Sequence, residues 1–162
     1  YHRSWSITAK KLHNMQSDLI NAKDEQEYDF NKNSLDKELS KIHVELKKLK
    51  GKFFNEGKIG MMEMSWLVFL DRADIINEFT KIDILENFEY LKKWQNDIKN
   101  TGIIEQSHAD NFKNTYKNYI ISTKGYLSSK ITGETIKPVV KKKSIAEMLA
   151  ASSNGCPIKR PE

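Results

Sequence analysis

One row of apolar residues constrains this chain more than any other feature of its sequence. Between positions 35 and 53 its members are 4, 3, 4, 3 and 4 residues apart: Leu35, Leu39, Ile42, Leu46, Leu49 and Phe53. This is the spacing of the a and d positions of a heptad, so it predicts an amphipathic helix with a narrow apolar seam. Asn33 is a suitable N-cap for that helix. Because the seam is short for a self-sufficient coiled coil, we expect it to pair with another helix of the same chain, with a homodimer as the alternative.

Apolar stripes at steps of three and four residues recur along most of the remaining chain. They predict helices over residues 5–22, 61–79, 80–100 and 107–123, while the polar stretch 23–34 is either a loop or a continuation of helix. The widest apolar face belongs to residues 61–79, which we therefore expect to form the most buried helix. Seven glycines and three prolines are few for 162 residues, which disfavours a turn-rich β fold. The predicted fold is all-α, a helical bundle of about five helices with a helical-hairpin or coiled-coil-like segment.

The character of the sequence changes after Gly125. Residues 127–143 contain Gly133, Pro138 and several β-branched residues but no helical stripe, so we expect extended chain there. Ser144 and Glu147 form a capping box, which predicts a short helix over residues 145–151. We therefore divide the chain into a helical bundle at residues 1–125 and a basic, extended C-terminal arm at residues 126–162.

The net charge of +5 is unevenly distributed and consists mostly of lysine. Only three of the 27 basic residues are arginine, whose planar head specific base recognition favours. Residues 61–105 carry a net charge of −4, whereas residues 106–162 carry +6. The basic third supports an alternative hypothesis, a nucleic-acid-binding accessory protein that contacts phosphates, with Tyr116 and Tyr119 as either stacking or core residues. Its candidate residues are Lys113, Lys117, Lys124, Lys130, Lys141, Lys142 and Lys143.

No residue pattern typical of an enzyme or a metal site occurs in the sequence. The four histidines are in separate segments, without a second histidine three or four residues away. Cys156 is the only cysteine, so an internal disulfide is excluded, and no base stands at a fixed spacing from its thiol. Glycine-rich phosphate loops are also absent from the sequence. We therefore assign no catalytic residue, no metal ligand and no cofactor, and expect a protein that is not an enzyme.

Protein contact is the leading functional hypothesis. The seam supplies Leu39 and Leu46 as candidate contact residues. Residues 61–66 are rich in methionine, whose flexible side chain adapts to partners, although core filling explains them as well. The helix predicted at residues 145–151 is too short to be stable alone, so we expect it to dock through Ile145, Met148 and Leu149. The sequence thus predicts a non-catalytic binding or regulatory protein whose partner is another protein or a second copy of this chain.

Membrane contact would require a segment upstream of Tyr1. No run of 18 apolar residues occurs in the sequence. Tyr1 and Trp5, near Arg3, Lys10 and Lys11, would suit the cytoplasmic edge of an upstream anchor. We expect a cytoplasmic location, with the soluble domain of a membrane-anchored protein as a second alternative.

Overall fold

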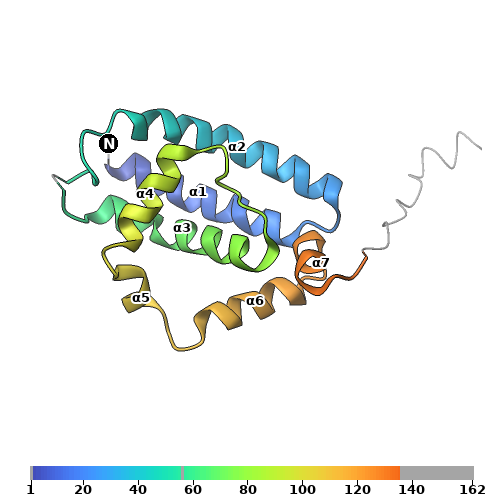
Figure 1. Cartoon of the computed structure of the whole chain (residues 1–162). Helices are drawn as coiled ribbons and strands as arrows, with labels where there is room; N and C mark the ends of the chain where they lie inside the picture. The colour runs from blue at the N-terminus through green and yellow to red at the C-terminus, as the bar shows by residue number, and fades with distance from the viewer. Residues whose placement is uncertain (1, 56, 136–162) are drawn as a thin grey trace, which may run out of the picture.

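The computed structural model of the chain describes residues 2–55 and 57–135, which form seven helices and no strand (Figure 1). The predicted all-α bundle is confirmed, although α5 and α7 were not expected. The predicted helix over residues 145–151 lies outside the described residues. In chain order the helices are α1 (His2–Asn21), α2 (Glu25–Lys47), α3 (Met61–Thr80), α4 (Glu89–Lys99), α5 (Ile103–Ser107), α6 (Phe112–Ser122) and α7 (Tyr126–Thr132).

Helices α1 and α2 form an antiparallel hairpin, and the turn between them determines where α2 begins. Asp24 is the N-cap of α2, because its Oδ1 accepts a hydrogen bond from the Glu27 backbone N–H at 2.8 Å. In return, Glu27 Oε2 accepts a hydrogen bond from the Lys23 backbone N–H at 2.9 Å. This reciprocal capping makes the polar stretch helical from Glu25 onward. Asn33 lies inside α2, so the prediction that it caps the helix was wrong.

The apolar seam of α2 is buried within the chain. Leu35 and Leu39 are 0% exposed and Leu46 is 5% exposed. Helix α2 packs against both α1 and α4. Lys11 of α1 and Glu38 of α2 form an ion pair across the hairpin at 3.0 Å. The seam therefore pairs with helices of the same chain, as its short length predicted.

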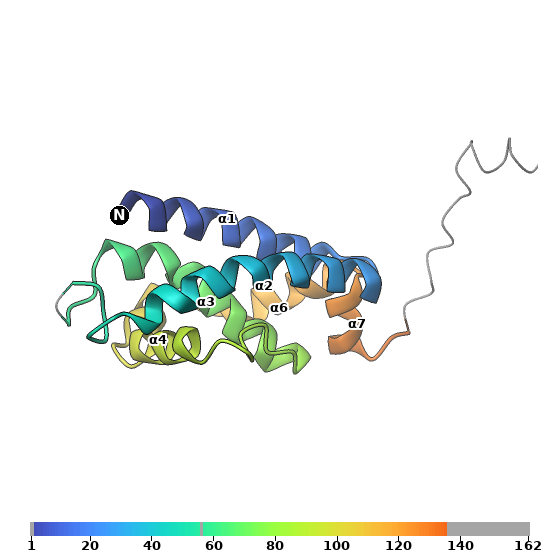
Figure 2. The same ribbon diagram turned by 90° about the horizontal axis from the view of Figure 1, so that it is seen from above.

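Helix α3 is at the centre of the bundle, as its wide apolar face predicted. It packs against α1, α4, α6 and α7, and Figure 2 shows it between α1 and α4. Three tryptophans meet beside it: the ring of Trp66 has its centroid 5.5 Å from that of Trp5 and 5.5 Å from that of Trp94. Trp66 Nε1 also donates a hydrogen bond to the Trp5 carbonyl oxygen at 3.2 Å. Because Trp5 is only 7% exposed, it is a core residue.

Helices α4 and α6 begin later than their apolar stripes predicted. Helix α4 begins at Glu89 and not near Thr80. In the connection before it, Thr80 Oγ1 and Asp83 Oδ1 each accept a hydrogen bond from the backbone N–H two residues on, at 3.2 and 2.9 Å. Such local bonds compete with the helical pattern. Likewise, Asn111 has a left-handed φ of 68° directly before α6, so the predicted start at residue 107 was wrong.

Helix α7 closes one end of the bundle, where the sequence predicted extended chain. Leu127 is 0% exposed, and the Tyr126 backbone N–H donates a hydrogen bond to the Ala22 carbonyl oxygen at 2.8 Å. A Cβ atom at Gly125 would overlap that carbonyl oxygen, so this approach requires glycine. With seven residues, α7 is too short to show a recurring apolar stripe. The expected extended arm beyond residue 135 lies outside the described residues and stays a prediction.

Candidate functional site

Three apolar side chains, Met61, Met64 and Val68, are exposed on one face of α3, and we call them the α3 strip. They are three and four residues apart and are 78%, 43% and 44% exposed. Met62 between them is 1% exposed, so the methionine-rich segment divides between surface and core. By contrast, Ile7 is 62% exposed but has no exposed large apolar neighbour on the described part of α1. Single exposed apolar residues are ordinary, whereas a group of them on one helical face is a candidate contact surface.

Helix α6 explains why only the first half of this face is exposed. Ile75 continues the strip by two turns and is 0% exposed, because α6 packs against this part of α3. Lys113 of α6 forms an ion pair with Glu78 of α3 at 2.9 Å, and Lys117 Nζ lies 4.9 Å from the centroid of the Phe79 ring. Figure 1 shows α6 beneath the C-terminal part of α3. A further contact joins Arg72 of α3 to the Tyr116 ring of α6, so all three of these contacts lie on the C-terminal side of the strip.

A buried carboxylate fixes the first turn of α3, from which the strip projects. Glu63 is 0% exposed. Its Oε2 accepts a hydrogen bond from the Gly60 backbone N–H, and its Oε1 accepts one from the Phe54 backbone N–H, both at 2.9 Å. A carboxylate in this place also interacts favourably with the helix dipole. The strip therefore lies on an ordered helix whose entry is well defined.

The contact residues that the sequence predicted are in two different places. Leu39 and Leu46 are core residues, so a partner would reach them only if the hairpin opened. They are therefore not part of the surface that this structure presents. Ile145, Met148 and Leu149 lie outside the described residues, so their role stays a prediction.

Two of the candidate phosphate-binding lysines already have partners on α3. The hydrogen bond between Lys113 and Glu78 raises the pKa of the Lys113 ammonium group. Lys117 lies over the Phe79 ring, at a distance typical of a cation–π contact. Because the ammonium groups of these two lysines already make contacts within the chain, we expect them to interact less favourably with a phosphate.

The other described lysines of the basic third are near the end of the bundle. Lys130 Nζ lies 4.6 Å from the centroid of the Tyr126 ring. Lys124 is exposed and follows α6 with a left-handed φ of 53°. Tyr116 is 7% exposed, so it packs in the core and is not a platform for a base. The remaining candidates lie outside the described residues: Lys141, Lys142 and Lys143.

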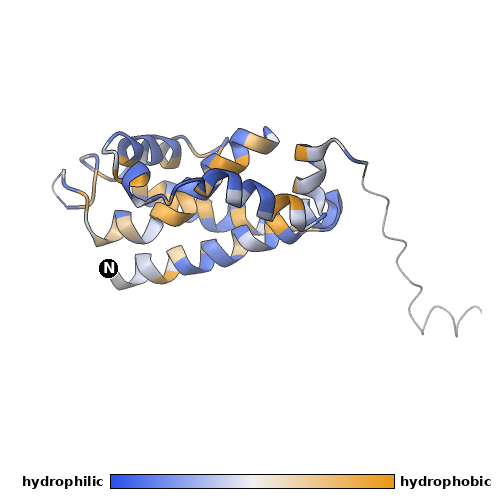
Figure 3. Cartoon of the chain, turned by 90° about the horizontal axis from the view of Figure 1, so that it is seen from below, coloured by the Kyte–Doolittle hydropathy of each residue, from blue (hydrophilic) through white to orange (hydrophobic). Residues whose placement is uncertain are grey.

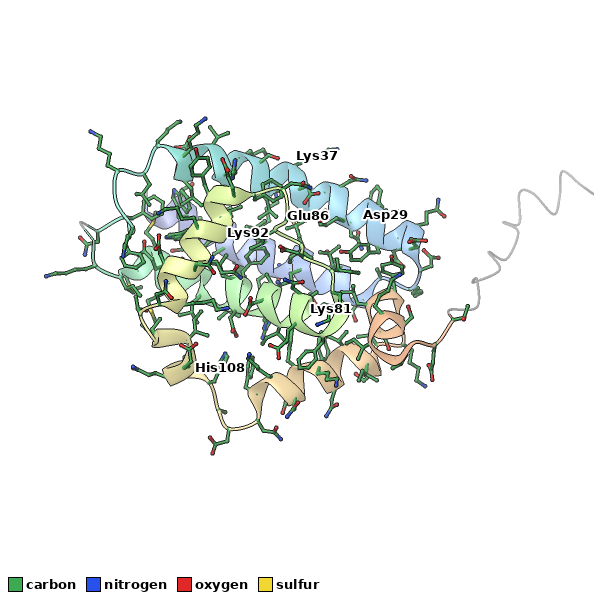
Figure 4. All side chains as sticks on the ribbon, in the orientation of Figure 1. Asp29, Lys37, Lys81, Glu86, Lys92 and His108 are labelled. Atoms are coloured by element: carbon green, nitrogen blue, oxygen red, sulfur yellow. The ribbon has the colours of Figure 1, made fainter. Side chains whose placement is uncertain are left out.

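Two histidines acquire partners from distant parts of the chain, which sequence reasoning missed. His108 lies in the connection between α5 and α6 (Figure 4), with its Nε2 atom 2.8 Å from Asp71 Oδ2. Burial raises the pKa of the Asp71 carboxyl group, although the hydrogen bond with His108 opposes this shift. His13 Nε2 lies 2.8 Å from Arg72 Nη1. These pairs are 37 and 59 residues apart, so no local spacing reveals them.

The described residues also bear on metal binding and membrane insertion. Within residues 2–55 and 57–135, no three His, Cys, Asp or Glu side chains come together as a set that could hold a metal ion. No helix in this part of the chain combines the length and the apolar character needed to cross a bilayer. Figure 3 shows polar and apolar residues interleaved along the helices. Cys156 lies outside the described residues.

Comparison with protein families, with curated proteins and with solved structures finds no match. We therefore infer function from the surfaces of this chain alone.

Proposed function

We propose that this chain is a non-catalytic binding protein that acts through helix-mediated protein contacts, with the α3 strip as its contact surface. The observation that carries this proposal is the exposure of Met61, Met64 and Val68 on one face that α6 does not cover. An amphipathic helix with apolar residues at positions i, i+3 and i+4 is the kind of partner that such a face binds. The two methionines also give the strip an adaptable shape.

We propose that segment 144–151 of the same chain binds to the α3 strip. Its apolar residues Ile145, Met148 and Leu149 have the required spacing. Helix α7, after which this segment follows, packs at the C-terminal end of α3 (Figure 1). From that end to Met64, the distance along the helix axis is about 24 Å. Residues 136–143 reach up to about 29 Å when fully extended. The connection is therefore long enough for the segment to reach the strip.

Charge favours the same assignment. Residues 61–105, which include α3, carry a net charge of −4. The connection to the segment contains four lysines: Lys137, Lys141, Lys142 and Lys143. Attraction between surface charges is weak and is screened by salt, so it guides the segment while apolar contact supplies the affinity. A helix of the same pattern on another protein would compete for the strip.

Methionine oxidation by hydrogen peroxide, followed by mass spectrometry, tests this proposal on the full chain. An uncovered strip predicts rapid oxidation of Met61, which is 78% exposed in the described part of the chain. Docking predicts slow oxidation of Met61 and Met64, and a return to rapid oxidation in the double variant Ile145→Asp, Leu149→Asp. Met62 is an internal control, because its burial keeps its oxidation slow in both proteins.

Ile7→Asp is a matched control, since it adds a negative charge at an exposed apolar position on a different helix, α1. We expect it to leave the oxidation rates of Met61 and Met64 unchanged. Equal rates in the unmodified chain and in the double variant would overturn docking by this segment. If Met61 and Met64 were protected from oxidation only at high protein concentration, docking within one chain would be overturned. The strip would then be a contact between two copies of the chain.

A further inference from the structure

A cleft of about 310 Å³ lies between α1, α3 and α6, and no residue of the α3 strip lines it. Its volume is within the range typical of small-molecule sites. None of the residues that line it is acidic. Its polar and aromatic lining consists of His13, Gln16 and Ser17 from α1, Arg72 from α3, and Tyr116 and Tyr119 from α6.

Arg72 brings a positive charge to this cleft and forms no ion pair with any described residue. Its Nη1 atom lies 2.8 Å from His13 Nε2, and its guanidinium carbon lies 5.1 Å from the centroid of the Tyr116 ring. Burial, and then the nearby guanidinium, lower the pKa of His13, so its imidazole is neutral at pH 7. Arg72 Nε is buried and has no hydrogen-bond partner among the described residues. An anion that bonded to this guanidinium would complete its hydrogen bonds and balance its charge.

Gln16 also lines the cleft and carries a hydrogen-bond acceptor that is unpaired in the described part of the chain. Its side chain is 1% exposed, and its Nε2 donates a hydrogen bond to the Phe69 carbonyl oxygen at 3.1 Å. Its Oε1 is buried and accepts no hydrogen bond from the described residues. Native proteins seldom leave such atoms unpaired. Two residues that line the cleft thus each carry a buried polar atom without a partner among the described residues, a donor on Arg72 and an acceptor on Gln16. Tyr119, which also lines the cleft, is 43% exposed.

We propose that this cleft binds a small aromatic carboxylate that carries an amino or hydroxyl donor. Because His13 occupies Nη1, the free edge of the Arg72 guanidinium consists of Nε and Nη2, which match the two oxygens of a carboxylate. The donor of the ligand bonds to Gln16 Oε1, and its ring stacks on Tyr119. A phosphate dianion matches less well, since the cleft supplies one arginine and no lysine. This site does not depend on the function proposed for the α3 strip.

Titration of the full chain with 2-aminobenzoate, followed by the fluorescence of this ligand, tests the proposal. We expect saturable binding. Benzoate lacks the donor for Gln16, and we expect it to bind about tenfold more weakly. Benzamide lacks the negative charge, and we expect it to bind more weakly than benzoate. Inorganic phosphate is the second anion probe, and it should not displace 2-aminobenzoate at comparable concentrations.

Variants assign the binding to the cleft. Arg72→Lys keeps the positive charge but cannot form the bidentate hydrogen bonds of a guanidinium, so we expect about tenfold weaker binding of 2-aminobenzoate. Gln16→Ala should abolish the preference for 2-aminobenzoate over benzoate. Lys124→Ala removes an exposed lysine that does not line the cleft, and it should leave the affinity unchanged. Tyr119→Ala removes the ring on which the ligand stacks and should weaken binding several-fold. Because Tyr119 is exposed, this variant tests binding in the cleft if the Arg72 variant does not fold.

Three results would overturn this proposal. The first is the absence of saturable binding up to about 10 mM ligand. The second is equal affinity in Arg72→Lys, or in Tyr119→Ala if the arginine variant does not fold. The third is displacement of the ligand by phosphate at comparable concentrations, which would assign the cleft to anions in general and not to carboxylates.

Discussion

Replacing Gly125 by alanine tests the packing that joins α7 to the end of α1. The added Cβ would overlap the carbonyl oxygen of Ala22 and would lie 3.2 Å from its carbonyl carbon. Both are backbone atoms, so neither can rotate away, and the two segments must separate. The hydrogen bond from the Tyr126 backbone N–H to the Ala22 carbonyl oxygen, 2.8 Å long, is then stretched or lost.

The magnitude follows from three contributions. Losing the Tyr126–Ala22 hydrogen bond costs about 1 kcal/mol. Displacing packed backbone to admit a methyl group costs about 1–3 kcal/mol. The smaller conformational freedom of alanine in the unfolded chain offsets about 0.4–1 kcal/mol of this. We therefore expect the free energy of unfolding of Gly125→Ala to fall by about 1–3 kcal/mol.

Urea unfolding, followed by tryptophan fluorescence, measures this change because the tryptophan cluster is in the core. We expect a lower midpoint with an unchanged slope. Gly51→Ala is the matched control: the nearest atom to an added Cβ is 3.9 Å away, and the backbone there has no positive φ. Equal losses of stability in the two variants, or none in Gly125→Ala, would refute the close approach of α7 to α1.

Three further predictions concern α2, His13 and the lysines of α6. Asp24→Ala removes the N-cap of α2 and should lower the free energy of unfolding by about 1 kcal/mol, whereas Asn33→Ala, inside the helix, should be neutral or slightly stabilising in the same urea titration. The pKa of His13 is lower in the folded chain than in the unfolded chain, so the unfolded chain binds this proton more tightly and stability should fall as the pH drops below 6.5. His13→Asn should flatten that part of the curve of stability against pH, and an unchanged curve would contradict this. Because Lys113 and Lys117 already have partners on α3, we expect no tight binding of duplex DNA at about 50 mM salt; tight binding that weakens steeply with salt would restore the nucleic-acid hypothesis.

The long helices could be predicted from the sequence because their apolar stripes extend over several turns. The seam from Leu35 to Phe53 predicted a helix and its pairing inside the chain, and both are confirmed as far as Leu46. Helix α2 ends at Lys47, so the prediction that Leu49 and Phe53 continue it was wrong. The broad apolar face of residues 61–79 predicted the central helix. In each case the pattern is long enough that its period is unambiguous.

The remaining elements depend on interactions that no periodic pattern records. Helices α5 and α7 have five and seven residues, too few for a stripe. The start of α4 depends on side chains such as Asp83 that bond to nearby backbone, and the start of α2 on Asp24. Apolar spacing alone does not show these competing bonds.

The candidate sites depend on tertiary structure even more strongly. The sequence identified a methionine-rich segment, but whether Met61 or Met62 faces solvent depends on which face of α3 packs against the other helices. The cleft combines Gln16, Arg72 and Tyr119 from three helices, and only the packing of these helices brings them together.

Paramagnetic broadening from a nitroxide on Cys156 tests most directly whether segment 144–151 occupies the α3 strip. Cys156 is the only cysteine, and the chain has only five methionines whose methyl signals must be resolved. Docking predicts strong broadening of the Met61 and Met64 methyl signals, and loss of that broadening in the double variant Ile145→Asp, Leu149→Asp. Met61 and Met64 signals that the nitroxide leaves unchanged would contradict the account.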